Sequence, residues 1–416
     1  FMTNLYWISF SLTFDENFKF LIPLTLLLIP TFLSIFFGLI FLFFIILKPK
    51  NLISSFLVFS LLFSILEFLR GSILTGFPWN FIAYSFSEQI RILSIISIIG
   101  TYGFNLFCIS LFISPALIIL RDSKKDLIVC FIFIISFILF YVHGFYYEKK
   151  FISSEKKFFD YKIRSIGSNI SLDRFYVNVD PTSILEELIK ISNPVSEEKT
   201  IFVWPEGILP IFSQDQISDL DKIIEENFSR NHLLIIGSSK EIIDKGSKKF
   251  FNSLSVYDNK LNLLSYYNKI KLVPFGEFLP FEKVLKRLGL KSLTNNYQSF
   301  SRGEERKIIN IEKKNFSLKI LPLICYEIIY SGKLFDKADF DLIVNISEDG
   351  WFGRSIGPRQ HFSHSILRAI ESGKYVIRSS NNGIASIINP LGVVEQIVDY
   401  GQSGYLDINK INKIQP

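Results

Sequence analysis

The chain has few cysteines and few histidines. Its 416 residues include three cysteines and four histidines, and three cysteines cannot build the disulfide framework of a small secreted domain. His361 and His364 lie three residues apart on a predicted helix, yet no further His or Cys pattern completes a metal site. We interpret all four histidines as surface or packing residues. Neither a zinc site nor a Cys-His protease is therefore expected.

Charge is also scarce, and it is unevenly spread. Charged residues make up 20% of the chain, and the net charge of +6 is scattered, without the basic block of a nucleic-acid-binding protein. There is no Gly-x-Gly-x-x-Gly pattern, phosphate-loop pattern or internal repeat. The first part of the chain is nearly all apolar, and most Lys and Glu residues follow Glu148. This asymmetry predicts a membrane domain over residues 1–150 and a soluble domain over residues 158–416.

Four apolar stretches are long enough, or nearly so, to cross a bilayer, which takes roughly 20 residues. They are residues 20–47, 52–66, 92–120 and 127–147. None resembles a signal peptide, so we expect retained helices. Lys and Arg gather in the connectors at 48–50 and 121–125, which places both connectors in the cytoplasm and the soluble domain outside it. The segment 1–19 then also lies outside, so we expect that one or more upstream helices are missing.

The loop between these connectors contains the aromatic turn Thr75-Gly76-Phe77-Pro78-Trp79. Such a turn suits the membrane–water interface on the non-cytoplasmic side. Glu67 and Arg70 stand at the end of the second apolar stretch, and two interpretations are open for them. They reach the lipid headgroups as interfacial residues, or they orient the aromatic turn toward a lipid-side entrance.

The soluble part alternates short β-rich apolar runs with helical patterns, which predicts a layered α/β domain. Strands are predicted at 162–166, 200–204, 233–237, 253–258, 263–267, 317–324, 342–346, 375–378 and 385–388. Helices are predicted at 181–191, 216–227 and 359–372. Three of the strands run into polar residues, namely Glu206, Cys325 and the segment 347–351. Strands that end this way bring such residues together at one edge of a sheet.

Cys325 is the only cysteine in the soluble part, and it closes a buried apolar strand. Cys108 and Cys130 fall inside apolar runs, where cysteine behaves as a small hydrophobe. A thiol is a weak nucleophile until a base or cation activates it. Glu206 as the base and Lys269 as the cation form the better pair for Cys325, because the carboxylate can take the proton and the ammonium can stabilise an oxyanion. A purely structural thiol is the alternative.

Several motifs together resemble the Glu-Lys-Cys triad of the nitrilase superfamily and, more narrowly, its membrane-embedded branch, the apolipoprotein N-acyltransferases. The resemblance covers nearly the whole chain. It is carried by Trp204-Pro205-Glu206, Tyr267-Asn268-Lys269, Pro274-Phe275-Gly276-Glu277, Ile324-Cys325-Tyr326-Glu327, Asp349-Gly350-Trp351-Phe352-Gly353, Arg378-Ser379-Ser380-Asn381-Asn382-Gly383 and Glu67-Phe68-Leu69-Arg70-Gly71.

The resemblance implies a multi-pass protein of the bacterial inner membrane with a periplasmic α-β-β-α sandwich. Glu206, Lys269 and Cys325 would be the catalytic base, oxyanion cation and nucleophile. The supporting residues would be Glu277, Glu327 and Tyr326, and substrate would contact Trp351, Phe275, Phe278, Trp79 and Arg378. Ordinary loop packing is the alternative for Trp351 and Tyr326, and a plain surface carboxylate for Glu277.

The implied reaction transfers an acyl chain from a phospholipid, through a thioester on Cys325, to the α-amine of a diacylglyceryl-cysteine apolipoprotein, with no cofactor or metal. Water must be kept from the thioester. The segment 275–290 is either a lid that enters the membrane face or an amphipathic helix over the core. Two rival functions remain open: a membrane-tethered amidase of the same superfamily, and a non-catalytic membrane scaffold.

The chain departs from the family pattern in places. Phe175 or Tyr176 stands where a Trp is usual, and Ser347-Glu348-Asp349-Gly350 replaces Ser-Asn-Asp-Ala. The sequence shows no C-terminal membrane helix. These departures affect the expected binding of substrate and the expected position of the protein in the membrane more than the expected reaction at the triad.

Overall fold

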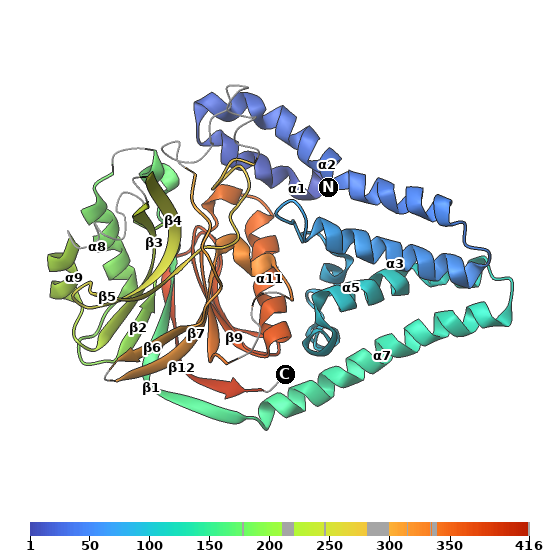
Figure 1. Ribbon diagram of the computed structural model, residues 1–416. Helices are drawn as coiled ribbons and strands as arrows, with labels where there is room; N and C mark the ends of the chain where they lie inside the picture. Colours follow the sequence, from blue (N-terminus) through green and yellow to red (C-terminus); the bar gives the residue numbers. More distant parts are fainter. Residues whose placement is uncertain are drawn as a thin grey trace.

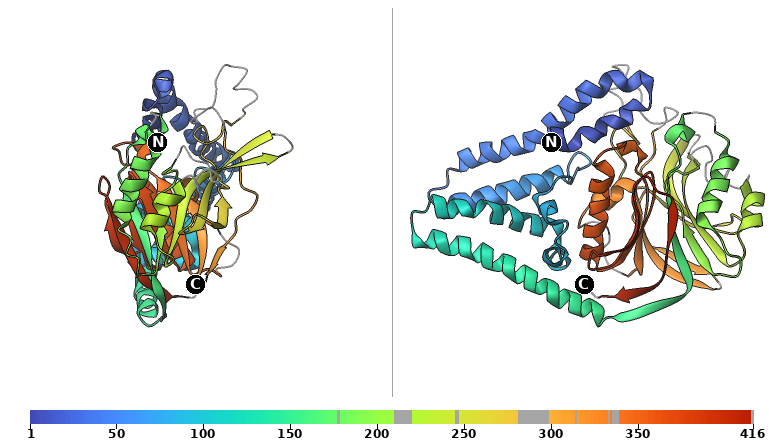
Figure 2. Two further views of the ribbon diagram at one scale, coloured as in Figure 1. Left: turned by 90° about the vertical axis from the view of Figure 1, so that its left-hand side faces the viewer. Right: turned by 180° about the vertical axis from the view of Figure 1, so that it is seen from behind.

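The computed structural model describes residues 1–176, 179–209, 220–244, 247–280, 299–313, 315–332, 334 and 339–414. A group of long helices extends from one side of a β-rich part (Figure 1). Helix α7 (Lys124–Ile152) is followed almost at once by strand β1 (Glu155–Ser168), so that the last long helix leads directly into the sheet (Figure 2).

The helical part contains long helices joined by short turns. Its elements are α1 (Met2–Leu5), η1 (Tyr6–Thr13), η2 (Glu16–Leu21), α2 (Ile22–Leu47), α3 (Leu52–Arg70), η3 (Ile82–Phe86), α4 (Ile90–Leu93), α5 (Ile96–Ile113), α6 (Pro115–Ile119) and α7. Helix α5 is bent at Gly100, whose φ of 69° is not helical. Only glycine adopts such an angle at little cost.

Among the described residues, four helical segments are long and apolar enough to cross a membrane. They are Glu16–Leu47, Leu52–Arg70, Ile96–Ile119 and Lys124–Ile152. The four predicted spans are therefore confirmed, although the second continues four residues beyond its predicted end. Large apolar side chains along α2 and α7 are exposed, which is what a lipid-facing helix requires.

The β-rich part is a twelve-stranded sheet. Its central path runs β5-β4-β3-β2-β1-β9-β8-β7-β6, with β12 added to β1, β10 to β9 and β11 to β10. The strands are β1, β2 (Thr200–Val203), β3 (His232–Asp244), β4 (Ser247–Asp258), β5 (Leu263–Asn268), β6 (Ile309–Lys313), β7 (Phe316–Ile324), β8 (Leu342–Glu348), β9 (Tyr375–Asn381), β10 (Ala385–Ile388), β11 (Val394–Val398) and β12 (Gly404–Lys413).

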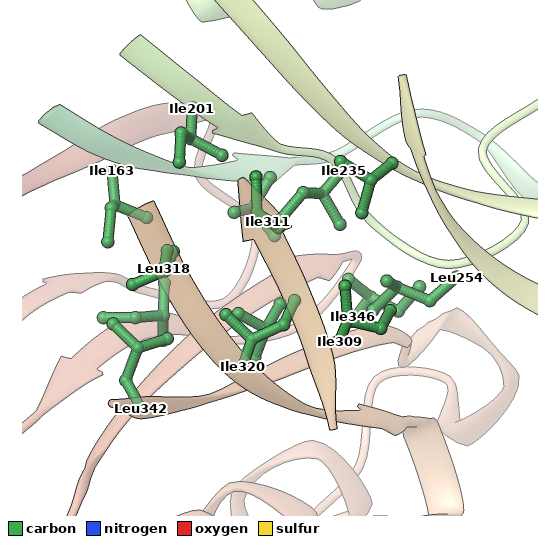
Figure 3. Close-up of a cluster of buried hydrophobic side chains, with 14 of the residues drawn as sticks. Ile163, Ile201, Ile235, Leu254, Ile309, Ile311, Leu318, Ile320, Leu342 and Ile346 are labelled. Atoms are coloured by element: carbon green, nitrogen blue, oxygen red, sulfur yellow. The ribbon is translucent and has the colours of Figure 1, made fainter. Parts of the chain in front are cut away.

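The sheet bends so that its two halves face each other across one apolar core. Figure 3 shows Ile163, Ile201 and Ile235 from one half opposite Leu318, Ile320 and Leu342 from the other. The neighbouring strands β7, β8 and β9 are parallel. Every residue of β8 is buried, as expected for a parallel strand that is covered on both faces.

Helices cover the two outer faces. Helices α8 (Pro181–Ser192) and α9 (Asp221–Asn227) pack through a second apolar cluster against β2 and β3. Helix α11 (Gly357–Ser372) covers the other half and lies between the sheet and α5 (Figure 1). The result is the predicted α-β-β-α sandwich, with its α11 face toward the membrane helices.

Most predicted elements are present, and the structure adds others. All nine predicted strands fall on β1–β5 and β7–β10, whereas β6, β11 and β12 were not predicted. Helices α8 and α11 are confirmed. Of the predicted helix 216–227, the structure describes residues 220–227, which include α9, and residues 216–219 lie outside the described part.

Candidate active site

The three predicted catalytic residues each follow the end of a strand. Glu206 comes three residues after β2, Lys269 directly after β5, and Cys325 directly after β7. Strands β2 and β5 belong to one half of the sheet and β7 to the other. The site therefore lies at the edge of the sandwich, where the ends of these strands meet.

Lys269 lies between two carboxylates. Its Nζ atom is 3.1 Å from Oε1 of Glu206 and 2.9 Å from Oε1 of Glu277. Asn252 Nδ2 donates to both of these oxygens, at 2.7 Å each. The second oxygens also accept backbone N–H groups, Glu206 Oε2 from Glu348 and Glu277 Oε2 from Val273. Both carboxylates are thus fixed in position.

Lys269 is 1% exposed, and burial by itself disfavours its charged form. The charges of Glu206 and Glu277 outweigh burial and raise the pKa of Lys269 above its ordinary value. Burial raises the pKa of Glu277, although Lys269 opposes this. The amine is therefore a permanent cation at neutral pH.

Cys325 begins the short helical turn η7 (Cys325–Ile329) with a φ of 45°. A non-glycine residue in this left-handed region is uncommon, and such strain concentrates at functional sites. The residue is 8% exposed. Burial first, and then the charge of Glu206, raise the pKa of its thiol well above normal, while Lys269 lowers it. The resting thiol is neutral, so an attack requires a base.

Glu327 joins the segments that carry the thiol and the lysine. Its Oε2 accepts the backbone N–H of Ile324, which precedes the thiol. Its Oε1 accepts the backbone N–H groups of Ile270 and Lys271, which follow Lys269. Tyr267 and Arg306 also donate to Oε1, at 2.8 and 3.0 Å. The fully buried carboxylate therefore sets the spacing between β5 and β7.

Tyr326 contacts the membrane domain. Its hydroxyl donates to the carbonyl oxygen of Gly76 at 2.9 Å, and the Tyr330 hydroxyl donates to that of Thr75 at 2.9 Å. Arg70 in turn donates to the carbonyl oxygen of Phe77 at 2.6 Å. The turn that follows α3 is thus bonded on one side to the membrane helix and on the other to η7.

The buried position of Glu67 and Arg70 contradicts the headgroup interpretation. Each is 2% exposed, they lie 3.5 Å apart, and Asn105 Nδ2 donates to Glu67. A charged pair that is enclosed by protein does not extend to the lipid headgroups or to water. The bond from Arg70 to Phe77 agrees with the other interpretation, in which the pair orients the aromatic turn.

Arg378 and Trp79 lie beneath the surface. The guanidinium of Arg378 is 0% exposed and donates to Asp349 Oδ2 at 2.7 Å, to Asn345 and to the carbonyl oxygen of Ile384. Trp79 is 2% exposed, and its indole donates to Gln360 at 2.9 Å. The polar atoms of both side chains are therefore hydrogen-bonded to other groups of the protein in this conformation.

The aromatic residues predicted at the surface of the site are more accessible. Trp351 belongs to η8 (Gly350–Phe352) and is partly exposed. Its ring contacts Phe175 at 5.2 Å and Tyr176 at 6.5 Å between centroids. Phe275 is 45% exposed and Phe278 is half-buried. Of the proposed lid, residues 281–290 lie outside the described part.

Sequence reasoning missed several residues around the triad. Asn252, which joins the two carboxylates, lies inside β4 and belongs to no motif. His361 Nδ1 lies 2.9 Å from Asp349 Oδ1, and its Nε2 is 3.3 Å from the carbonyl oxygen of Cys325. Burial lowers the pKa of His361 although Asp349 raises it, so the ring is neutral. Asp349 stands in a motif that carries the resemblance and His361 was interpreted as a surface or packing residue, so the sequence did not indicate that the two side chains pair.

The described residues contain no group of three or more His, Cys, Asp or Glu side chains that could hold a metal ion. The charged centre is the buried set of Glu206, Lys269 and Glu277 beside the Cys325 thiol. Its chemistry is proton transfer by a carboxylate, nucleophilic attack by sulfur and stabilisation of an oxyanion by an ammonium.

Comparisons with known proteins identify the family of the chain. Residues 162–407 match the carbon-nitrogen hydrolase family, and residues 1–113 match the apolipoprotein N-acyltransferase N-terminal domain. The apolipoprotein N-acyltransferase of Bradyrhizobium diazoefficiens is 31% identical over 412 residues, which cover 96% of this chain and 76% of that protein. For Rhodopseudomonas palustris the identity is 30% over 422 residues, with 98% and 77% covered. For Brucella melitensis it is 28% over 416 residues, with the same coverage.

Proposed function

The chain belongs to the apolipoprotein N-acyltransferase family, and on that premise we propose that it transfers an acyl chain from a phospholipid to the N-terminal α-amine of a diacylglyceryl-modified lipoprotein. The observation that carries the proposal is the buried cluster of Glu206, Lys269 and Cys325. It lies at the end of the sandwich, in a chain whose described residues include four candidate membrane spans. The proposed chemistry needs no cofactor.

In the first half-reaction Cys325 attacks the carbonyl carbon of a phospholipid ester. Glu206 takes the thiol proton as the carbon–sulfur bond forms, and the carbonyl oxygen becomes an oxyanion near Lys269. The intermediate then expels the glycerol oxygen, which receives the proton from Glu206 and leaves as a lysophospholipid. The raised pKa of the thiol supports a requirement for a base.

In the second half-reaction the lipoprotein α-amine attacks the thioester. Glu206 accepts a proton from the attacking nitrogen, the carbon–sulfur bond breaks, and the sulfur is reprotonated. A thioester converts to an amide downhill, so no further energy source is needed. Lys269 stabilises the oxyanion of both tetrahedral intermediates, and its contact with Glu277 remains while Glu206 carries the proton.

The supporting residues act through position. Glu277 and Asn252 orient Lys269 and Glu206 by the hydrogen bonds described above. Glu327 sets the distance between the lysine and the thiol. Tyr326 connects η7 to the aromatic turn through its hydrogen bond to Gly76. We propose that Trp351, Phe275 and Phe278 form the exposed apolar surface that contacts lipid. Arg378 contributes by orienting Asp349 and His361 beside the thiol.

We assign the protein to the bacterial inner membrane, with the sandwich in the periplasm. The basic connectors at 48–50 and 121–125 lie at the ends of α2 and α7 that are distant from the sheet (Figure 1). The positive-inside rule places those ends in the cytoplasm. The site would then face the outer leaflet, which is where a lipoprotein with a membrane-anchored N-terminus presents its amine.

The proposal is tested by following both products of a reaction between labelled phospholipid and a diacylated lipopeptide. We expect lysophospholipid and N-acylated lipopeptide in equal amounts, and neither with Cys325→Ala. Free fatty acid in place of the acylated peptide would identify a membrane-tethered amidase. Binding of both lipids without any product from the native chain would identify a non-catalytic scaffold.

A further inference from the structure

A buried ion pair lies next to the carboxylate that is proposed as the base. Glu348, the last residue of β8, pairs with Arg174 of the short helical segment η4 (Leu172–Phe175). The two side chains are at most 2% exposed. Glu348 is also the residue whose backbone N–H donates to Glu206 Oε2, at 3.0 Å. The ion pair and the base are therefore joined through one residue.

The contacts of Glu348 indicate a charged carboxylate. Its Oε2 accepts from Arg174 and from Asn381 Nδ2, and its Oε1 accepts the backbone N–H of Gly350 at 2.8 Å. The orientation of the Asn381 amide is fixed, because its Oδ1 accepts the backbone N–H of Ile170 at 2.9 Å. Within the described residues, the groups that hydrogen-bond this carboxylate are all donors. Only the ionised form can accept from all of them.

Arg174 connects the pair to the other side of the loop that carries the base. Its guanidinium carbon lies 4.4 Å from the centre of the Phe175 ring. A Cβ at Gly207, the residue after the base, would lie 3.6 Å from that ring. Two segments thus lie against this loop, one through Phe175 and one through the backbone N–H of Glu348. The ion pair joins these two segments.

Gly350 belongs to the same arrangement. A Cβ at this position would lie 2.8 Å from Glu348 Oε1 and 2.9 Å from Leu172 Cδ1. Alanine, the residue of the Ser-Asn-Asp-Ala pattern, therefore does not fit beside the carboxylate unless the carboxylate moves. The two departures from that pattern, Glu348 and Gly350, are parts of one structure.

We propose that the Arg174–Glu348 pair positions the catalytic base by holding the backbone N–H of Glu348 on Glu206 Oε2. The inference rests on the proposed function in taking Glu206 as the base. Oε1 of Glu206 faces Lys269, whereas within the described residues the N–H of Glu348 is the one hydrogen-bond partner of Oε2. If the end of β8 moves, the carboxylate loses the contact that fixes its second oxygen and with it its orientation toward the Cys325 thiol.

The test uses the full chain and a probe that needs the thiol and the base but no recognition of phospholipid. The thiol of Cys325 attacks p-nitrophenyl butyrate, its proton passes to the base and p-nitrophenolate leaves, so that intact mass gives the rate of butyrylation. We expect Arg174→Met to lower this rate at least about tenfold at pH 7, the effect of losing one hydrogen bond to a charged group. Arg174→Lys, which keeps the charge, should recover part of the rate.

The pH dependence separates positioning from a purely structural role. At pH 7 the neutral thiol needs the base, whereas at pH 10 a growing thiolate fraction reacts without it. The defect of Arg174→Met should therefore be smaller at pH 10. Gly350→Ala, which displaces Glu348 Oε1 without removing a charge, should show the same pattern if Arg174→Met does not fold. A pair that only stabilised the fold would lower the rate by the same factor at both pH values.

Arg164→Met is the matched control. Arg164 also pairs with a carboxylate, that of Asp407 at 2.7 Å, donates to the carbonyl oxygen of Ser192 and lies 3.9 Å from the centre of the Tyr405 ring. Its loss should lower the unfolding midpoint in urea but leave butyrylation at the native rate.

Native rates in both Arg174→Met and Gly350→Ala, or a defect of equal size at both pH values, would overturn the positioning role. Butyrylation of the native chain without any acyl-enzyme from phospholipid would refute the proposed function instead, and the comparison of the variants with p-nitrophenyl butyrate would still decide the role of the pair.

Discussion

Replacing Glu206 by Gln should make the Cys325 thiol more acidic while it abolishes catalysis. The carboxylate of Glu206 raises the pKa of the thiol, and the ammonium of Lys269 lowers it. Glu206→Gln removes the negative charge, so the thiolate becomes easier to form. Lys269→Met removes the positive charge, so the thiolate becomes harder to form. Both variants should lose acyl transfer, but the pKa of the Cys325 thiol should fall in Glu206→Gln and rise in Lys269→Met.

Glu206 and Lys269 both act electrostatically on the thiol, in opposite directions. Two unit charges about 5 Å apart at an effective dielectric constant of about 20 interact by roughly 3 kcal/mol. Since about 1.4 kcal/mol corresponds to a factor of ten, a reaction that requires the thiolate should change in rate by about a hundredfold when either charge is removed.

The assay is the rate of Cys325 alkylation by iodoacetamide between pH 7 and 10, measured by intact mass. We expect the Glu206→Gln rate to exceed that of the native chain at pH 8, and the Lys269→Met rate to fall below it. Glu225→Gln is the control, since this carboxylate is exposed on α9 and pairs with Lys260 at 3.2 Å. Shifts in the same direction for both active-site variants would refute the electrostatic account of the thiol.

Three further substitutions test the positioning contacts. Glu327→Gln should lower stability by about 3 kcal/mol, because it removes the fully buried carboxylate that pairs with Arg306, whose side chain is 14% exposed; the unfolding midpoint in urea measures this. Gly76→Ala should reduce acyl transfer at least tenfold: its φ is 76° and a Cβ would lie 2.2 Å from a backbone oxygen, which displaces the carbonyl that accepts the Tyr326 hydroxyl. Native activity would contradict that role. Asp349→Asn should lower the melting temperature at pH 7, and by a smaller amount near pH 3, where the contribution of the carboxylate has begun to fall. Although burial opposes ionisation of Asp349, its cationic and hydrogen-bonding partners depress its pKa, so its contribution is present above its unfolded pKa and disappears as the pH falls. An equal difference at both pH values would argue against it.

The sequence predicted well which candidate site residues follow the end of a strand, because this placement depends on local patterns. Glu206 and Cys325 each follow a short β-rich apolar run, and such runs are recognisable from composition alone. Strands β6 and β11 were missed because each is five residues long and includes polar or charged side chains. Their assignment depends on a partner strand that is distant in the sequence.

Contacts between distant segments could not be predicted. No local pattern indicates that Asn252 joins Glu206 to Glu277, or that Tyr330 donates to the turn after α3. Arg378 illustrates the reverse case: its motif suggested contact with substrate, whereas the structure encloses it with Asp349. Such pairings depend on how the two halves of the sheet face each other.

The most direct measurement is intact-mass analysis of the native chain after incubation with phospholipid alone, followed by addition of diacylated lipopeptide. The account predicts one added acyl mass on Cys325 that is stable in neutral buffer and is lost when the peptide is added, with the same mass gained by the peptide amine. An acyl mass on another residue, or an unmodified Cys325 during active turnover, would contradict it.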